Sequence, residues 1–374
     1  MPKLPFNYAA RRMLFQRRKY QNRLEGYSSC TLGALLQELY GVEEWTSSLQ
    51  TSRAVDRIYG LLGIAQDTEV LNLVPDYSRD TEWVYTDAAG KMLQRGEFGL
   101  LSLAQHATQP SLLPSWVPDW RLPMKAPVAK RSLSPVFRPF GNIEIVCPSP
   151  QPNDFRVLEI AGTAVDEIEQ VGLPLGYSYQ QTTAENLQHV QCYLSQIQAF
   201  CRQSASLATG LYGDSDRWME DAFWRIPIGD LANPTPGQYT MVRATETSFT
   251  YHQSLLKVIA VSNEAKDSTV GNEEPTKLAA VRSAEFGKYE QYLFGVVNKA
   301  GQAPFITKRG YVGIGPPNMA AEDIICIFYG AHVPYVLRPV EDGRYTLIGE
   351  TYVYGIMDGE FMIDSPKKDI FLVV

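Results

Sequence analysis

The stretch from residue 301 to residue 374 constrains the fold most, because it alternates short β-forming runs with glycine-containing turns. Asp342-Gly343 and Asp358-Gly359 separate such runs, and an Asp-Gly pair in that setting predicts a hairpin. Gly310 to Gly315 is predicted to be a further turn. Short strands at this spacing predict a small antiparallel barrel or curled sheet. The β-forming runs are Pro304–Thr307, Ile324–Tyr329, Pro334–Arg338, Tyr345–Ile348 and Tyr352–Met357.

Helical periodicity dominates the beginning of the chain. Leucines at positions 32, 35, 36 and 39 follow Thr31, a residue type that caps helices, and they form one apolar stripe. A second helix is predicted from Ser52 or Asp56 through Leu62. A third is predicted from about Thr81 to Gln94, with the preceding Asp80 supporting its start.

The central part of the chain is predicted to be mainly helical as well. Ala184 to Gln203 has the clearest apolar stripe, and shorter helices are predicted at Trp218–Trp224 and Leu278–Phe294. Val157 to Gly162 is predicted to be a strand. Ser262 to Lys277 is polar and contains Gly and Pro, which predicts a mobile loop.

These patterns together predict an α+β protein with mainly helical N-terminal and central regions and a small antiparallel β-barrel-like C-terminal module. Three domains are predicted. Residues 1–150 form a helical region with a Pro- and Trp-rich segment, 151–300 a mixed, mainly helical region, and 301–374 the β-rich module.

Charge and cysteine content exclude several classes of protein. Lys and Arg number 34 against 41 Asp and Glu, and a net charge of −7 argues against binding to a nucleic-acid backbone. The five cysteines do not form a disulfide framework, and no apolar run is long enough to cross a membrane. The basic run from Arg11 to Arg23 is interpreted as a solvated helix face rather than a serine-poor transit peptide. A cytoplasmic location is therefore predicted.

No motif for a metal, a nucleotide or a catalytic nucleophile is present. None of the four histidines has partners at metal-ligand spacing, and the acidic group from Asp214 to Asp221 is interpreted as a charged helix face. There is no Gly-x-Ser-x-Gly segment and no phosphate loop ending in Gly-Lys-Ser/Thr. We therefore predict no metal and no cofactor. The histidines are His106, His189, His252 and His332.

Aromatic side chains form the remaining candidates for a site. Trp116 and Trp120 lie in the proline-rich segment Gln109–Pro127, where they either line an apolar pocket or attach this segment to the core. Tyr352 and Tyr354 alternate along a predicted strand, so they share a face that either holds a ligand or is covered by a neighbouring domain.

Several stretches resemble the fungal heterokaryon-incompatibility (HET-domain) family. Arg53-Ala-Val-Asp-Arg-Ile-Tyr-Gly-Leu-Leu-Gly-Ile-Ala65 is similar to the family's RDKIYALLGLA segment. Pro75-Asp-Tyr-Ser78 followed by Val84-Tyr-Thr-Asp87 resembles its PDYS and VYTD stretches. Leu113-Pro-Ser-Trp-Val-Pro-Asp-Trp120 resembles its Pro/Trp segment almost letter for letter. Toward the end, Pro334-Tyr-Val-Leu-Arg338 also fits the pattern.

The resemblance also indicates what differs from full members of the family. Those begin with a Trp-Gly pair and a Cys-Ile-Asn-Gln segment in a TIR-like half, whereas here Trp45 is followed by Thr46 and no cysteine precedes Ile-Asn. We therefore expect a truncated member without the half thought to carry signalling and cell-death activity. This argues against a NAD-cleaving effector.

Shortened proteins that resemble this family occur in fungal secondary-metabolite pathways, where some look like ring-forming enzymes. The resemblance therefore implies a cofactor-independent cyclase, such as a Diels–Alder-type pericyclase, that folds a flexible apolar terpenoid or polyketide in a pocket. Tyr85 and Arg338 are predicted to donate hydrogen bonds, and the pocket is predicted to be shaped by Trp116, Trp120, Tyr352 and Tyr354.

The alternative is a non-enzymatic incompatibility-like protein that acts through protein contacts. A closed apolar cavity with a few polar groups favours catalysis, and a packed interior favours a binding role. The sequence does not predict the oligomeric state.

Overall fold

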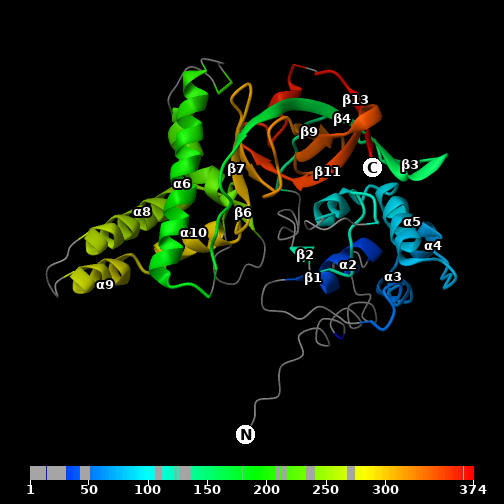
Figure 1. Cartoon of the computed structure of the whole chain (residues 1–374), viewed down its shortest axis with the longest axis horizontal. Helices are drawn as coiled ribbons and strands as arrows, with labels where there is room; N and C mark the ends of the chain where they lie inside the picture. The colour runs from blue at the N-terminus through cyan, green and yellow to red at the C-terminus, as the bar shows by residue number, and fades with distance from the viewer. Residues whose placement is uncertain are drawn as a thin grey trace, which may run out of the picture.

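The computed structural model describes residue 14 and residues 31–42, 51–105, 112–122, 124–125, 136–178, 180–207, 211–212, 217–232, 241–267, 274–364 and 366–374. The basic residues from Arg11 to Arg23, His106 and the acidic pair Asp214 and Asp216 lie outside this part. The fold is α+β with a strand-rich C-terminal module, as predicted. Figure 1 shows a central curved sheet with one group of helices, α6 to α10, on one side and the N-terminal helices on the other.

The N-terminal helices confirm most of the predicted pattern. In α2 (Leu32–Tyr40) the four leucines of the stripe are buried, and the Thr31 hydroxyl accepts the Ala34 N–H at 3.2 Å. Helix α5 (Thr81–Leu93) begins after Asp80, whose carboxylate accepts the Trp83 N–H at 2.7 Å. The second predicted helix is shorter than expected, because only α3 (Asp56–Tyr59) is α-helical there and turns follow it. The remaining short elements are α4 (Thr68–Leu71), η1 (Phe98–Leu103), β1 (Gly41–Val42) and β2 (Met124–Lys125).

Two of the central helices are slightly longer than predicted, whereas the helix predicted at Leu278–Phe294 is divided into α9 and α10 near Gly287, and α8 was not predicted. Helix α6 (Thr183–Ser206) begins with a capping box between Thr182 and Glu185 and contains the predicted apolar stripe. The predicted loop from 262 to 277 is wrong at both ends, because 262–267 continue α8 and 274–277 begin α9. Ser262 is buried, so tertiary packing overrides the polar composition there. The other elements are α7 (Arg217–Arg225), η3 (Ile226–Ile228), β5 (Leu231–Ala232), β6 (Val242–Arg243), α8 (Glu246–Asp267), α9 (Glu274–Glu285) and α10 (Lys288–Val297).

A closed ring of strands forms the barrel. The long strand β4 (Asp154–Val171) pairs with β13, which pairs in turn with β11, β10 and β9, and β9 returns to β4. The end of β4 also pairs with β7, which pairs with β8, and β8 pairs with β12. The other strands are β3 (Ser149–Gln151), β7 (Ala303–Thr307), β8 (Val312–Gly315), β9 (Ile324–Phe328), β10 (Tyr335–Pro339), β11 (Arg344–Glu350), β12 (Tyr352–Val353) and β13 (Asp369–Val373).

The barrel confirms the predicted hairpin at Asp342-Gly343 and corrects other details. Both residues have positive φ, 59° and 69°, and they connect the antiparallel strands β10 and β11. Asp358-Gly359 does not form a hairpin, because the strands on either side, β12 and β13, pair with other strands. The predicted turn at Gly310–Gly315 contains β8, and the predicted strand at Tyr352–Met357 is reduced to β12. The sheet is mixed, because β11 and β13 are parallel.

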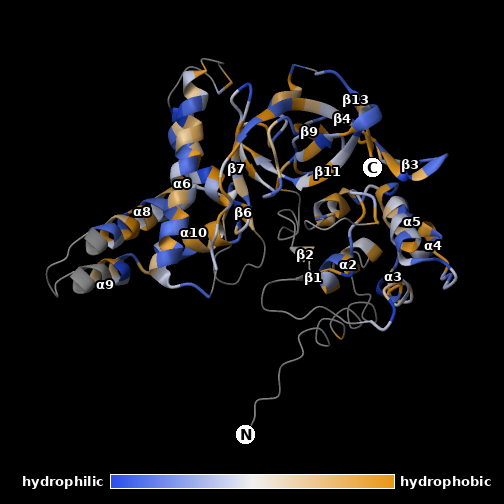
Figure 2. Cartoon of the chain, viewed as in Figure 1, coloured by the Kyte–Doolittle hydropathy of each residue, from blue (hydrophilic) through white to orange (hydrophobic). Residues whose placement is uncertain are grey.

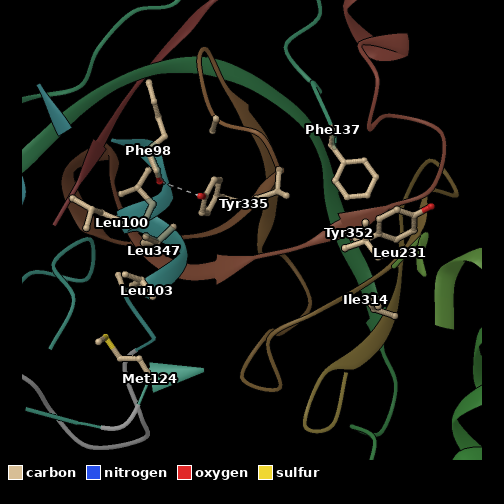
Figure 3. Packing of buried hydrophobic residues seen from close by; sticks show 14 of the residues in the cluster. Phe98, Leu100, Leu103, Met124, Phe137, Leu231, Ile314, Tyr335, Leu347 and Tyr352 are labelled. Carbon is tan, nitrogen blue, oxygen red and sulfur yellow. Dashed lines mark hydrogen bonds between the residues drawn. The ribbon is translucent and has the colours of Figure 1, made fainter. Parts of the chain in front are cut away.

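Both faces of the barrel wall are packed with side chains. In β9, Ile325 and Ile327 belong to one buried cluster, whereas Cys326 and Phe328 belong to another. This alternation follows from the two faces of a strand. The second cluster continues into the N-terminal region, where the Tyr335 hydroxyl donates to the Phe98 carbonyl of η1 at 3.4 Å (Figure 3). The same hydroxyl lies 2.8 Å from the Ser102 hydroxyl. Apolar residues accordingly lie where the sheet packs against the helices on either side of it (Figure 2).

Candidate functional site

The two tryptophans of the predicted pocket wall lie in the core. Both Trp116 and Trp120 have no exposed surface. The Trp116 Nε1–H donates to the Arg156 carbonyl at 2.9 Å, and the Trp120 ring meets the Tyr85 ring edge-on at 4.9 Å. Tyr85 in turn donates its hydroxyl to the Ala54 carbonyl at 2.9 Å, and burial raises its pKa above the ordinary value. These contacts attach the proline-rich segment to β4, which carries Arg156, and to α5, which carries Tyr85.

Arg338, the second predicted donor, forms a bidentate ion pair. Its guanidinium donates to both carboxylate oxygens of Asp323, at 2.8 and 2.9 Å, and also to the Asn318 carbonyl. Asp323 is buried, and this ion pair raises the pKa of Arg338. The guanidinium therefore holds the loop before β9 against the end of β10.

Tyr352 and Tyr354 lie near one another beside a group of charged side chains. Tyr352 is buried and its ring lies 6.0 Å from that of Phe137 (Figure 3), and burial raises its pKa. The Tyr354 hydroxyl donates to Asp221 at 3.2 Å, and its ring contacts Tyr212 at 5.5 Å. The structure thus brings together Tyr85 with Trp120, and Tyr352 with Tyr354. Whether any of the six residues binds a substrate stays a prediction.

The charged group beside these tyrosines has Asp230 at its centre. Its carboxylate, 1% exposed, pairs with Arg225 at 2.7 Å and with Arg243 at 2.6 Å. Arg225 also pairs with Asp221, and Arg243 with Asp358 of the loop after β12. Burial raises the pKa of Asp230, and the two guanidinium groups oppose that rise. This ion-pair cluster joins α7 and β6 to the barrel module.

A cavity of about 170 Å³ opens next to this cluster, and we call it the α8–α10 cavity. Its walls come from η3, the β5–β6 hairpin, the first turns of α8 and the middle of α10. None of the six predicted side chains lines it. Its residues are of ordinary types from three separate segments, so no sequence motif marks them. They are Ile228, Leu231, Ala232, Val242, Arg243, Thr245, Thr247, Ser248, Tyr251, Gln291, Tyr292 and Gly295.

A buried histidine lies behind the cavity wall. The ring of His252 lies 5.1 Å from that of Tyr292, and neither of its nitrogens has a hydrogen-bond partner among the described residues. Burial lowers the pKa of His252 to about 4, so the imidazole is neutral at neutral pH. Tyr292 donates its own hydroxyl to the Trp224 carbonyl at 2.7 Å.

The described residues contain no group of three His, Cys, Asp or Glu side chains that would hold a metal ion. Within the same ranges, no helix has both the length and the apolar character needed to cross a membrane.

The fold therefore defines a β-barrel protein of mixed sheet with helices packed on both sides. Residues 155–373, more than half of the chain, match the Het-6 beta-barrel domain. The chain belongs to this heterokaryon-incompatibility family, which confirms the resemblance seen in its motifs.

A curated relative extends the comparison toward the N-terminus. Heterokaryon incompatibility protein 6, OR allele, of Neurospora crassa is 29% identical over 393 aligned positions, covering 96% of this chain and 56% of the relative. The chain thus spans about half the length of that relative. No solved structure matches the chain.

Proposed function

We propose that this protein acts in heterokaryon incompatibility through contacts with a protein partner. The observation that carries the proposal is the packing of the barrel, whose wall has buried side chains on both faces. Its family and the name of its Neurospora crassa relative support the same reading.

A buried polar pair of the barrel also forms its hydrogen bonds within the barrel module. Thr163 of β4 and Tyr329, which follows β9, are joined through their hydroxyls at 2.6 Å, and Thr163 also donates to the Lys367 carbonyl. A small barrel filled in this way is a rigid support rather than a ligand chamber. Recognition then rests on the surface that the support presents.

Expression in a filamentous fungus tests this proposal. One Neurospora crassa strain would express the chain, an isogenic strain would carry the empty vector, and heterokaryon formation and death of fused cells would be scored. We expect fewer viable heterokaryons in mixed pairings than in self pairings. Heterokaryons at the frequency of the empty-vector pairing, with the protein detected in the cells, would contradict the proposal.

A second candidate is the cofactor-independent ring closure predicted from the sequence, on a terpenoid or polyketide substrate. The α8–α10 cavity supplies the apolar surface and the hydroxyl groups that such a reaction needs, but its volume of about 170 Å³ holds only one ring of such a substrate, so the rest of the substrate would lie outside it. The predicted roles of Tyr85, Arg338, Trp116, Trp120, Tyr352 and Tyr354 belong to this candidate.

Incubation of the purified protein with linear polyene or terpenoid aldehydes tests the second candidate. Faster ring formation than in buffer, with an altered ratio of stereoisomers, would support it. A rate and a product ratio equal to those in buffer would reject it for those substrates.

A further inference from the structure

The α8–α10 cavity has the size of a single ring. Its volume is about 170 Å³, and an apolar protein cavity of about 150 Å³ is enough to hold benzene. Sites for larger ligands generally reach 300 Å³ or more. The occupant that fits this cavity is therefore a monocyclic molecule with small substituents.

The lining of the cavity combines apolar surface with hydrogen-bonding groups. Ile228, Leu231, Val242 and the helical Gly295 form apolar surface, with Gly295 bringing the α10 backbone close to Ile228. The start of α8 and α10 also contribute hydroxyl and amide groups to the lining. Those groups belong to Thr245, Thr247, Ser248, Tyr251 and Gln291.

Two of the lining residues, Ser248 and Tyr251, carry a hydroxyl that has no acceptor among the described residues. Ser248 is 6% exposed, and its Oγ accepts the Thr245 N–H at 3.2 Å. The proton of the Ser248 hydroxyl is not used in that bond and is free to be donated. Tyr251 lies one turn further along the same helix and also lines the cavity. A carbonyl oxygen, which only accepts hydrogen bonds, is the complementary group.

The charges beside the cavity disfavour an anion. Arg243 is the cation of the wall, but it donates to Asp230 through Nε and to both oxygens of Asp358 through Nη1. Both carboxylates that pair with Arg243 already occupy its guanidinium, so it offers a carboxylate ligand no unpaired cation.

We propose that the α8–α10 cavity is a binding site for a neutral monocyclic carbonyl compound. The ring lies on the apolar part of the lining, and the carbonyl oxygen accepts from the hydroxyls of Ser248 and Tyr251. This inference goes beyond the proposed incompatibility function. It requires only that the ligand binds, without turnover. A failed binding test would therefore not contradict either candidate function, each of which has its own experiment.

Three isosteric probes distinguish the ligand classes by NMR titration of the whole chain. Benzamide is neutral with a carbonyl, benzoate is its anionic analogue, and benzylammonium is cationic. We expect benzamide to bind with a Kd on the order of 1 mM, the range for a ligand of this size, and benzoate to bind at least about tenfold more weakly. Absence of benzamide binding, or tighter binding of benzoate or benzylammonium, would overturn the proposal.

Two variants locate the site. Tyr251→Phe removes one donor at nearly constant shape, and we expect it to weaken benzamide binding by about fivefold. Tyr345→Phe on β11, outside the cavity, is the matched control and should leave the Kd unchanged. Gly295→Ala adds a methyl group 3.0 Å from Ile228 Cγ2 in the cavity lining, so it should weaken binding, and its Tm measured alongside checks that the fold is retained. Unchanged affinity in both cavity variants would place benzamide elsewhere and reject the site.

Discussion

Asp230 and Arg243 are joined by a 2.6 Å ion pair in which the carboxylate is 1% exposed and the guanidinium 39% exposed. Asp230 precedes β5 and Arg243 ends β6, so the pair closes a hairpin at the edge of the α8–α10 cavity. Arg243 extends the connection to Asp358 in the barrel module. The same ion pair therefore lies at the edge of the cavity and, with Arg225, joins α7 and the β5–β6 pair to the barrel module.

Asp230→Asn should destabilise the protein strongly. It leaves the Arg225 and Arg243 guanidinium groups without their shared carboxylate, and loss of one partner from a buried pair costs about 3 kcal/mol. Urea unfolding measures the change. Asp369→Asn, which breaks the exposed pair with Lys367, is the control and should have no measurable effect. Equal stability of the two variants would mean that the buried cluster contributes nothing.

The two tryptophans should respond differently to replacement by phenylalanine. Trp116→Phe removes the hydrogen bond to the Arg156 carbonyl and should cost about 1 kcal/mol more than Trp120→Phe. The Trp120 Nε1 has no partner among the described residues, and a phenyl ring there keeps the edge contact with Tyr85. Replacement of either by Ala should cost about 4 kcal/mol through the cavity it creates. Unfolding in guanidinium chloride measures the free energy of unfolding of each variant. A smaller loss of that free energy for Trp116→Phe than for Trp120→Phe would contradict the prediction.

Local signals predicted part of the helices and part of the barrel, and they missed α8 altogether. The leucine stripe of α2, the Asp80 cap and the Asp342-Gly343 hairpin depend on neighbours within a few residues, so the sequence alone indicates them. Strand β13 pairs with β4 across more than 190 residues, and no local pattern encodes such a pairing.

The site was harder to predict than the fold. Aromatic residues were favoured as pocket walls, yet Trp116 and Trp120 are fully buried, and a large ring packs a core by the same physics that lines a pocket. The cavity instead uses Thr, Ser and Gln side chains that become neighbours only when α8 and α10 pack together.

Gly162→Ala should weaken the barrel where β4 crosses β9. A Cβ atom at Gly162 would lie 2.5 Å from the Ile327 carbonyl oxygen, so the two strands must separate, and overpacking of this kind costs about 2 kcal/mol. Gly63→Ala is the matched control, since a Cβ there meets nothing within 4 Å. Thermal unfolding followed by circular dichroism compares the two. A Tm for Gly162→Ala equal to that of Gly63→Ala would show that the crossing tolerates a side chain.

Acid should destabilise the fold through His252. Burial lowers its pKa from 6.5 to about 4, so the unfolded chain takes up the proton first as pH falls. The stability due to the neutral imidazole is therefore complete above about pH 6.5 and is lost progressively toward pH 4. Between pH 7.5 and pH 5 this single group should remove about 2 kcal/mol from the free energy of unfolding.

Replacement of His252 isolates that contribution. His252→Phe fills the space with an apolar ring and removes two buried nitrogens without partners, so it should reduce the loss of stability between pH 7.5 and pH 5. His189→Gln, on the exposed face of α6, is the control and should keep the full loss. Urea unfolding at the two pH values measures both variants. An unchanged loss in His252→Phe would assign the acid sensitivity to other groups and would indicate that the imidazole is solvated in solution.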